Sequence, residues 1–208
     1  MNALNSLLSR TSRRAPVRLR EHERGVSMVE FMLVLPIFLV LTIGLMEFAV
    51  AFNAMLGVNF ASREAALIAA ESGTESIADC RVLQRIEDSI TSPADAGRIT
   101  QVRVYRAGVN GNELAANVYA RGGSTTCQFW DGVETQDITV QYTLVSGGYQ
   151  PATRCTSLEG CSGQPLDTIG VEISYQHSWV TPLAGMLTFT GTSIDVTRAN
   201  AMRMEPVL

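Results

Sequence analysis

The sequence predicts an α+β fold, in which a long N-terminal transmembrane helix and a second helix accompany an antiparallel β-sheet. Two observations lead to this prediction. The first third of the chain contains a long, nearly uncharged apolar stretch, and from residue 101 onward apolar residues alternate with polar ones, as they do in half-buried antiparallel strands. Helices that precede a run of strands are typical of an α+β domain whose helices cover one face of the sheet.

A basic leader precedes the apolar stretch. The chain has 208 residues and a formal net charge of −4, with 16 basic residues, all of them arginine, and 20 acidic residues. Six of the arginines and only two of the acids lie before residue 25. Because arginines keep their flank of a membrane helix in the cytoplasm, we expect a cytoplasmic N-terminus and an exported body. The acidic body argues against nucleic-acid binding, which needs a basic surface.

A membrane-spanning helix is expected after this leader. Residues 31–46 carry no charge and lie between Glu30 and Glu47. A helix from Val26 to Glu47 would be about 32 Å long at about 1.5 Å per residue, which matches the roughly 30 Å hydrocarbon core of a bilayer. Pro36 removes one backbone hydrogen bond from this helix, so we expect a kink there.

Outside the membrane the helix is expected to continue to Ser72, with Gly73 as its stop signal. An apolar stripe on this second half needs a packed domain or neighbouring subunits to cover it. The stripe consists of Phe48, Phe52, Met55 and Leu56. The sequence thus divides into a leader (1–25), a transmembrane and extended helix (26–72) and an exported α+β domain (73–208).

Three interpretations of the N-terminal region are open. The helix is an uncleaved signal anchor, a secretory signal peptide with a cleavage site at residues 49–51, or the membrane helix of a prepilin. The third interpretation rests on Gly25, because a glycine at this junction with Glu30 as the fifth residue after it resembles the processing site of type IV prepilins. In that family a membrane-embedded aspartyl peptidase cuts directly after the glycine. Such a cut would free the amine of Val26 one helical turn from Glu30, where it can neutralise the carboxylate.

The residues after Gly25 extend the resemblance. Residues 29–31, Leu35-Pro36, Gly44 and Glu47-Phe48 form the pattern "VEF…LP…G…EF". This pattern resembles the TadE/TadF-like pseudopilins of tight-adherence (Flp, type IVb) pilus systems, over residues 24–70. The resemblance implies a minor pseudopilin that prepilin peptidase processes between Gly25 and Val26. Glu30 and Glu47 are then expected to set the register of the subunit during assembly.

The resemblance also implies a location, a general plan and partners. The protein is expected to be a single-pass protein of the bacterial cytoplasmic (inner) membrane and of the pilus, with a pilin-like fold. Its partners would be prepilin peptidase, the other pseudopilins and the major pilin, the inner-membrane pilus assembly platform with its ATPase, and membrane lipid. The alternative is a membrane-anchored extracytoplasmic binding or sensor module with an uncleaved signal anchor.

Within the exported domain, apolar residues spaced three and four apart predict a second helix over residues 76–91. Alternation predicts strands around residues 102–105, 138–144, 171–179, 187–189 and 194–196. Asn110-Gly111 is a hairpin signal, and two further turns are expected at residues 122–124 and 147–149. The two tryptophans, Trp130 and Trp179, are expected in the core.

Four cysteines lie in the domain that is expected to be exported. An even number of cysteines in an oxidising compartment favours disulfides, and four allow three pairings. We favour Cys155–Cys161, which closes a short glycine-containing loop, and Cys80–Cys127, which ties the second helix to the strands. A metal site is disfavoured because no C-x-x-C motif occurs and His177 is the only downstream histidine.

No catalytic motif is recognisable in the sequence. His22 lies in the leader, and His177 shares a predicted strand face with Tyr175 and Trp179, so we expect His177 to be a packed or surface residue. Nucleophile elbows, P-loops, dinucleotide-binding and zinc-protease motifs are absent from the sequence. We therefore expect a structural protein, with no enzymatic activity, cofactor or metal.

Overall fold

The computed structural model describes residues 20–156, 161, 165–181 and 191–204. The chain divides into two units, Met1–Leu45 and Met46–Leu208, and helix α1 (Arg20–Glu71) contributes to both. The second unit also contains α2 (Ala78–Ser89), β1 (Ile99–Ala107), β2 (Glu113–Trp130), β3 (Thr135–Gly147), β4 (Thr168–Ser178) and β5 (Ser193–Arg203). The predicted α+β fold class is confirmed.

Helix α1 ends close to the predicted position but starts earlier. It begins at Arg20 rather than Val26, so Gly25 lies within helical backbone. At the other end, the amide of Ser72 donates a hydrogen bond to the carbonyl of Ile68 at 2.9 Å, and Gly73 follows with a φ of 56°. A positive φ favours glycine, and a glycine in this conformation is a common helix stop.

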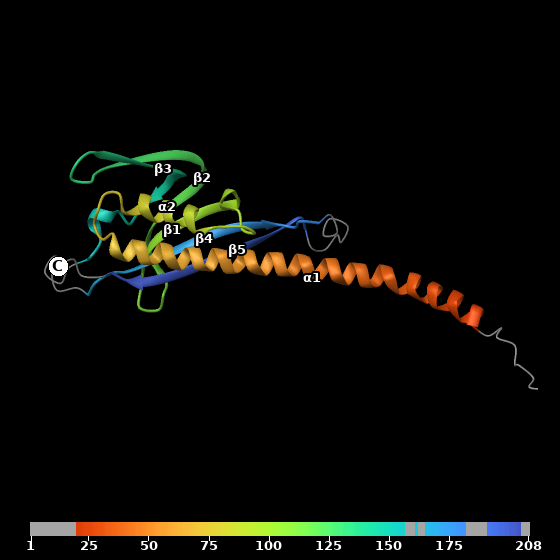
Figure 1. Cartoon of the computed structure of the whole chain (residues 1–208). Coiled ribbons are helices and arrows are strands. Elements are labelled where there is room, and N and C mark those ends of the chain that lie inside the picture. Colours follow the sequence, from red (N-terminus) through yellow and green to blue (C-terminus); the bar gives the residue numbers. More distant parts are fainter. Residues whose placement is uncertain (1–19, 157–160, 162–164, 182–190, 205–208) are drawn as a thin grey trace, which may run out of the picture. The chain divides into compact units, whose positions relative to one another are not determined.

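The strands form one antiparallel sheet in the order β3-β2-β1-β4-β5. Within the second unit, α1 and α2 lie on the same face of this sheet (Figure 1). Two hydrogen bonds show that α1 crosses β4 and β5. The Ser62 hydroxyl donates to the Val171 carbonyl of β4 at 2.7 Å. The side-chain amide of Asn200 in β5 donates to the carbonyl of Asn59 at 3.3 Å. Helix α2 lies over β2 and β3.

The face of α1 that packs on the sheet is made of small residues, namely Ala51, Ala54, Val58, Ala61, Ala65, Ala66 and Ala69. Small side chains let the helix backbone approach the strands closely. The large residues of the predicted apolar stripe lie elsewhere on the helix: Phe48 is 68% exposed, and Phe52 and Leu56 are each about half exposed. The domain therefore covers the alanine face and leaves the stripe uncovered.

The remaining core comes from α2 and the central strands. Helix α2 is shorter than the predicted 76–91 and buries Val82, Leu83 and Ile86. The inward residues of the strands complete the same core under the two helices, and they are Val102, Val104, Val140, Tyr142, Ile169, Val171, Ile173 and Tyr175. These residues alternate along β1, β3 and β4, as the sequence predicts for half-buried strands.

The prediction of a turn at Gly122-Gly123-Ser124 is wrong. These residues lie inside β2, where the pairing with β3 shifts in register between Arg121 and Thr125 and Gly122 has a φ of 115°. The irregularity is a bulge, which glycine permits because it has no Cβ. Beyond the bulge, the β2–β3 hairpin turns back over α2 (Figure 1), and there Cys127 is bonded to Cys80 of α2.

The prediction that both tryptophans lie in the core is wrong for Trp130. Trp130 ends β2 and is 66% exposed, close to Val133 in the turn, which is 84% exposed. Trp179, which follows β4, is partly buried. The strand expected at residues 187–189 lies outside the described residues.

Candidate functional site

The apolar part of α1 is the feature that the sequence singles out for function. In the described part of the chain, one helix, Gly25–Glu71, is long and apolar enough to cross a membrane. Every side chain from residue 25 to residue 34 is exposed. A helix that exposes apolar side chains all around is typical of a membrane span. The N-terminal helix therefore suggests a single-pass membrane anchor.

Gly25, Val26 and Glu30 lie on this helix, and Val26 and Glu30 are one turn apart. All three are exposed. A Cβ atom at Gly25 would meet no other atom within 4 Å, and the same holds at Gly44. Glycine inside a helix costs about 1 kcal/mol relative to alanine, so packing in the described part of the chain gives no reason for a glycine at position 25.

Pro36 lies inside α1, and helical backbone continues on both sides of it. Proline has no amide hydrogen, so the carbonyl of Met32 lacks its usual helical donor. In a bilayer such a carbonyl needs a local adjustment or a neighbouring group to satisfy it. The apolar segment of α1 therefore has one backbone hydrogen bond fewer at Pro36.

Glu47 has an environment that differs from that of its neighbours. It is 8% exposed, whereas Met46 and Phe48 on either side are largely exposed. Its Oε2 accepts a hydrogen bond from the amide of Val180 at 3.1 Å, and its Oε1 accepts one from the amide of Thr181. Amide donors compensate a carboxylate for water lost on burial. Glu47 thus fixes the chain just after β4 to α1, although 133 positions separate Glu47 from Val180.

His177 is packed near this contact and is 1% exposed. Its ring lies 6.5 Å from that of Tyr175 and 6.0 Å from that of Trp179. Neither ring nitrogen has a hydrogen-bond partner in the part of the chain that the structure describes. Burial, and then the positive charge of Arg98, lower the pKa of His177, while the nearby Glu47 opposes the shift. His177 is therefore a packed residue whose burial favours the neutral form of the ring.

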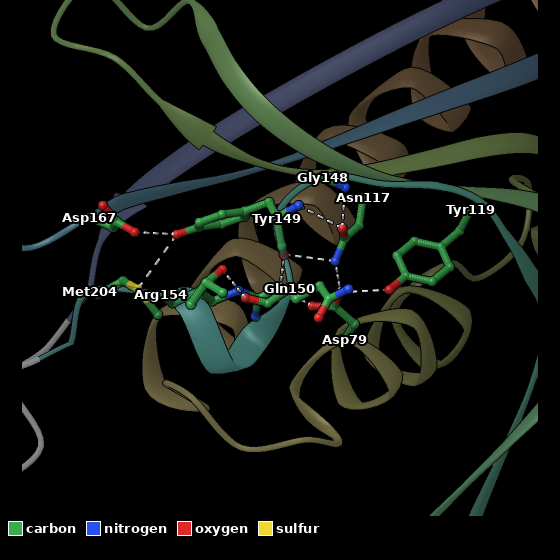
Figure 2. A network of polar contacts seen from close by, with 10 residues as sticks. Asp79, Asn117, Tyr119, Gly148, Tyr149, Gln150, Arg154, Asp167 and Met204 are labelled. Carbon is green, nitrogen blue, oxygen red and sulfur yellow. Dashed lines mark hydrogen bonds and ion pairs between the residues drawn. The ribbon is translucent and has the colours of Figure 1, made fainter.

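A buried polar network joins α2 to the sheet (Figure 2). The carboxylate of Asp79 in α2 has three donors. Its Oδ2 accepts hydrogen bonds from Asn117 Nδ2 at 2.7 Å and from the Tyr119 hydroxyl at 2.6 Å, and its Oδ1 pairs with the guanidinium of Arg154. Burial and the adjacent Asp79 charge raise the pKa of Tyr119, so Tyr119 stays protonated and donates.

Asn117 and Tyr149 extend the network to the connection between β3 and β4. Asn117 Nδ2 also donates to the carbonyl of Tyr149 at 2.8 Å, and Asn117 Oδ1 accepts from the amide of Tyr149 at 2.9 Å. The Tyr149 hydroxyl donates to Asp167 Oδ2 at 2.9 Å, and the Arg154 guanidinium lies over the Tyr149 ring, 4.9 Å from its centre. Because the fold encloses this network, its role is structural: it connects α2, β2 and the β3–β4 connection.

Two disulfides add covalent connections, and they are the two that the sequence favours. Cys80–Cys127 joins α2 to the β2–β3 hairpin, and Cys155–Cys161 closes a short loop between β3 and β4. Their Cα–Cα distances of 6.4 and 5.6 Å fall in the normal range for disulfides. Within the described ranges, no group of three or more His, Cys, Asp or Glu residues is placed to hold a metal ion.

Comparison with known proteins finds a family model that matches part of the N-terminal helix. Residues 25–67 match the model of the TadE-like protein family. The matched segment contains Gly25, Glu30, Pro36 and Glu47, so the resemblance expected from residues 24–70 is confirmed over this segment. The match ends before α2, and no curated protein and no solved structure matches the chain.

Sequence reasoning missed the burial of Asp79 and the contact that Glu47 makes, for different reasons. Asp79 lies three and seven positions before Val82 and Ile86, hence on the apolar face of α2. A lone acid on such a face signals a buried partner, so this residue was detectable. The contact of Glu47 with Val180 has no local signal, because it depends on how the sheet packs against α1.

Proposed function

We propose that this chain is a minor pseudopilin, a structural and assembly component of a Tad (Flp) pilus or a related secretion system. The TadE-like family suggests a component associated with a Tad pilus, and the proposal adds that the chain is cleaved and assembled. The precursor lies in the bacterial cytoplasmic membrane with its N-terminus in the cytoplasm and residues 73–208 outside. It works as a structural subunit and does no chemistry of its own.

The proposal rests on where the family match begins. The match starts at residue 25, which is the glycine at the junction of the basic leader and the apolar segment. It includes Glu30, the fifth residue after that glycine. It leaves out the arginine-rich leader. The part shared with the family therefore starts at the glycine after which we propose cleavage.

Cleavage after Gly25 would give Glu30 a partner. The new amine of Val26 lies one helical turn from the Glu30 carboxylate. A carboxylate inside the bilayer costs about 3 kcal/mol on insertion scales, and an amine of the same or a neighbouring subunit offsets this cost. Glu30 then sets the depth and register at which the subunit joins its neighbours.

The outer face of α1 supports assembly through the helix. Phe48, Phe52, Leu56 and Phe60 are four positions apart, so they lie on one face, and each is 52–68% exposed. The sheet of the same chain packs on the alanine face instead. A row of exposed, large apolar residues marks a protein contact. In this proposal the helices of other pseudopilins and of the major pilin cover the row in the assembled pilus. Prepilin peptidase and the inner-membrane assembly platform act on the subunit before it reaches the pilus.

N-terminal sequencing of the membrane-extracted protein tests the cleavage. The mature protein should begin at Val26. Gly25→Ala should leave the precursor uncut, whereas the matched control Gly44→Ala should be processed normally, since an added Cβ meets no atom at either position. A wild-type chain that begins at Met1 would contradict the proposal and favour an anchored binding or sensor module. A chain that begins at Phe52 would indicate a secretory signal peptide.

The role of Glu30 is tested separately from cleavage. Glu30→Ala should be processed at Gly25 but should impair pilus assembly, which electron microscopy of surface pili measures. Glu71→Ala removes an exposed acid at the other end of the same helix and should leave assembly unchanged. Normal piliation of the Glu30 variant would show that this carboxylate does not set the register.

A further inference from the structure

The chain just after β4 is fixed at the point where the apolar segment of α1 ends. Glu47 directly follows the uncharged residues 31–46. Its carboxylate accepts hydrogen bonds from the amides of Val180 and Thr181, which come directly after the end of β4 at Ser178. The backbone of Val180 therefore lies beside Glu47, the residue at which the uncharged segment 31–46 of α1 ends.

Two side chains at this place, those of Trp179 and Val180, are apolar, and the guanidinium of Arg98 lies beside them, where it donates to the carbonyl of Ser178 at 3.3 Å. Val180 is 70% exposed, and Trp179 beside it is partly exposed. No charged residue occurs between His177 and Asp195 in the sequence, whereas the β2–β3 turn contains Asp131 and Glu134. Tryptophan is enriched at the headgroup level of membranes, where its ring meets an apolar and a wet environment.

Glu47 fixes the position of Trp179 and Val180 relative to α1. A carboxylate near lipid is costly when it has no partners, and the two amide donors satisfy the two oxygens of Glu47. The same two hydrogen bonds fix the backbone that carries Trp179 and Val180. The depth of these side chains is thereby linked to the depth of α1.

We propose that Trp179 and Val180 form a second membrane contact of this protein, at the boundary between lipid headgroups and acyl chains, and that Glu47 positions it. The contact orients the exported domain on the membrane that α1 crosses. This inference rests on the anchoring by α1 in the proposed function, and it is independent of cleavage and of pilus assembly.

The positions of the two tryptophans allow a matched test. Trp130 lies three positions after Cys127, which is bonded to Cys80 in the first turn of α2. It is therefore near the Glu71 end of α1, which is about 36 Å along the helix from Glu47. Trp130→Phe leaves Trp179 as the sole tryptophan, and Trp179→Phe leaves the exposed Trp130 as the control.

Both full-length variants are reconstituted into phosphatidylcholine vesicles whose acyl chains carry bromine close to the headgroup. The emission of Trp179 should be quenched relative to unbrominated vesicles, and the emission of Trp130 should not. Equal emission of Trp179 in both kinds of vesicle would overturn the inference. Flotation of the vesicles is measured first. A chain that does not float with the vesicles would overturn the anchoring by α1, and the inference with it. A chain that floats with them but whose Trp179 is not quenched would overturn the inference alone.

Charge substitutions at two exposed valines complete the test. In the Trp130→Phe background, Val180→Asp should abolish most of the quenching because a carboxylate is excluded from the acyl boundary. Val133→Asp, on the exposed β2–β3 turn, should leave the quenching unchanged. Quenching that persists in Val180→Asp would show that this side chain is not in the membrane. A blue shift of Trp179 that appears only at high protein-to-lipid ratio would assign the surface to a second copy of the chain and would also overturn the inference.

Discussion

The Asp79 carboxylate and the Arg154 guanidinium form an ion pair that is almost fully withdrawn from water, with 7% and 0% of the side chains exposed. Asp79 lies in α2, and Arg154 lies 75 positions later, between β3 and β4. Nε and Nη1 of Arg154 have no hydrogen-bond partner among the described residues. The Asp79 carboxylate is therefore the group that compensates most of the buried positive charge of Arg154.

Replacing Asp79 by alanine should destabilise the domain strongly. The change leaves the Arg154 charge buried without its partner and removes the acceptor of Tyr119, so the free energy of unfolding should fall by about 3–5 kcal/mol. Denaturant unfolding of the full chain in detergent, followed by near-UV circular dichroism, measures this. Asp88→Ala removes an exposed acid from the same helix and should change the free energy by less than about 0.5 kcal/mol. Similar losses in both variants would contradict the assigned role of the pair.

A second prediction concerns Gly170, which lies directly opposite Tyr105 in the β1–β4 pairing. The Tyr105 ring occupies the space that a Cβ at position 170 would need. Gly170→Ala should therefore cost about 1–3 kcal/mol of unfolding free energy through overpacking. In a Tyr105→Ala background the same substitution should cost much less, which a double-mutant cycle measures. An equal cost in both backgrounds would mean that backbone strain, and not the ring, requires the glycine.

Sequence periodicity predicted the strands in which buried and exposed residues alternate. The alternation of Val102 and Val104 and of Val171 and Ile173 marks strands that are buried on one face, and these became β1 and β4. Strand β2 was missed because alternation is weak at its start and Gly122-Gly123 suggests a turn. A bulge and a turn both use glycine at positive φ, so only pairing with β3 distinguishes them.

The buried face of α1 shows a second limit of prediction from the sequence. The spacing of Phe48 and Phe52 predicts an apolar face correctly, but not which face the sheet covers. Close approach of a helix to a sheet needs small residues, so the alanines are buried and the phenylalanines are left exposed. For the candidate site, the residues from Gly25 to Glu47 could be found by motif, because they form one continuous pattern in the sequence. The contact of Glu47 with Val180 could not be found in this way, because it depends on tertiary packing.

The two disulfides should contribute unequally to stability. Cys80–Cys127 spans 47 positions and Cys155–Cys161 spans 6. On the chain-entropy model, the longer loop stabilises by about 4 kcal/mol and the shorter by about 2 kcal/mol. Paired serine variants, Cys80→Ser with Cys127→Ser and Cys155→Ser with Cys161→Ser, should differ in the free energy of unfolding accordingly. Each pair is the control for the other, and an equal loss would indicate that loop length does not decide the contribution.

The last prediction is a dependence of stability on pH that His177 causes. Burial and Arg98 hold the pKa of His177 below its ordinary value in the folded chain, whereas in the unfolded chain the value is about 6.5. Above about pH 6.5 the ring is neutral in both states, and its full contribution to stability is present. As the pH falls below this value, the unfolded chain takes up a proton that the folded chain resists. The contribution of His177 to stability is therefore lost as the pH falls toward the folded-state pKa.

The comparison of the wild-type chain with His177→Gln isolates this effect, because glutamine does not titrate and the carboxylates, including Glu47, titrate in both proteins. The wild-type chain should be more stable than the variant at pH 7.5, where both packing and neutrality of the imidazole are intact. Its advantage in unfolding free energy should shrink steadily as the pH falls below about 6.5. Denaturant unfolding at several pH values measures the difference. An advantage that stays constant over this range would show that His177 takes up a proton without cost in the folded chain, in conflict with its burial between Tyr175 and Trp179.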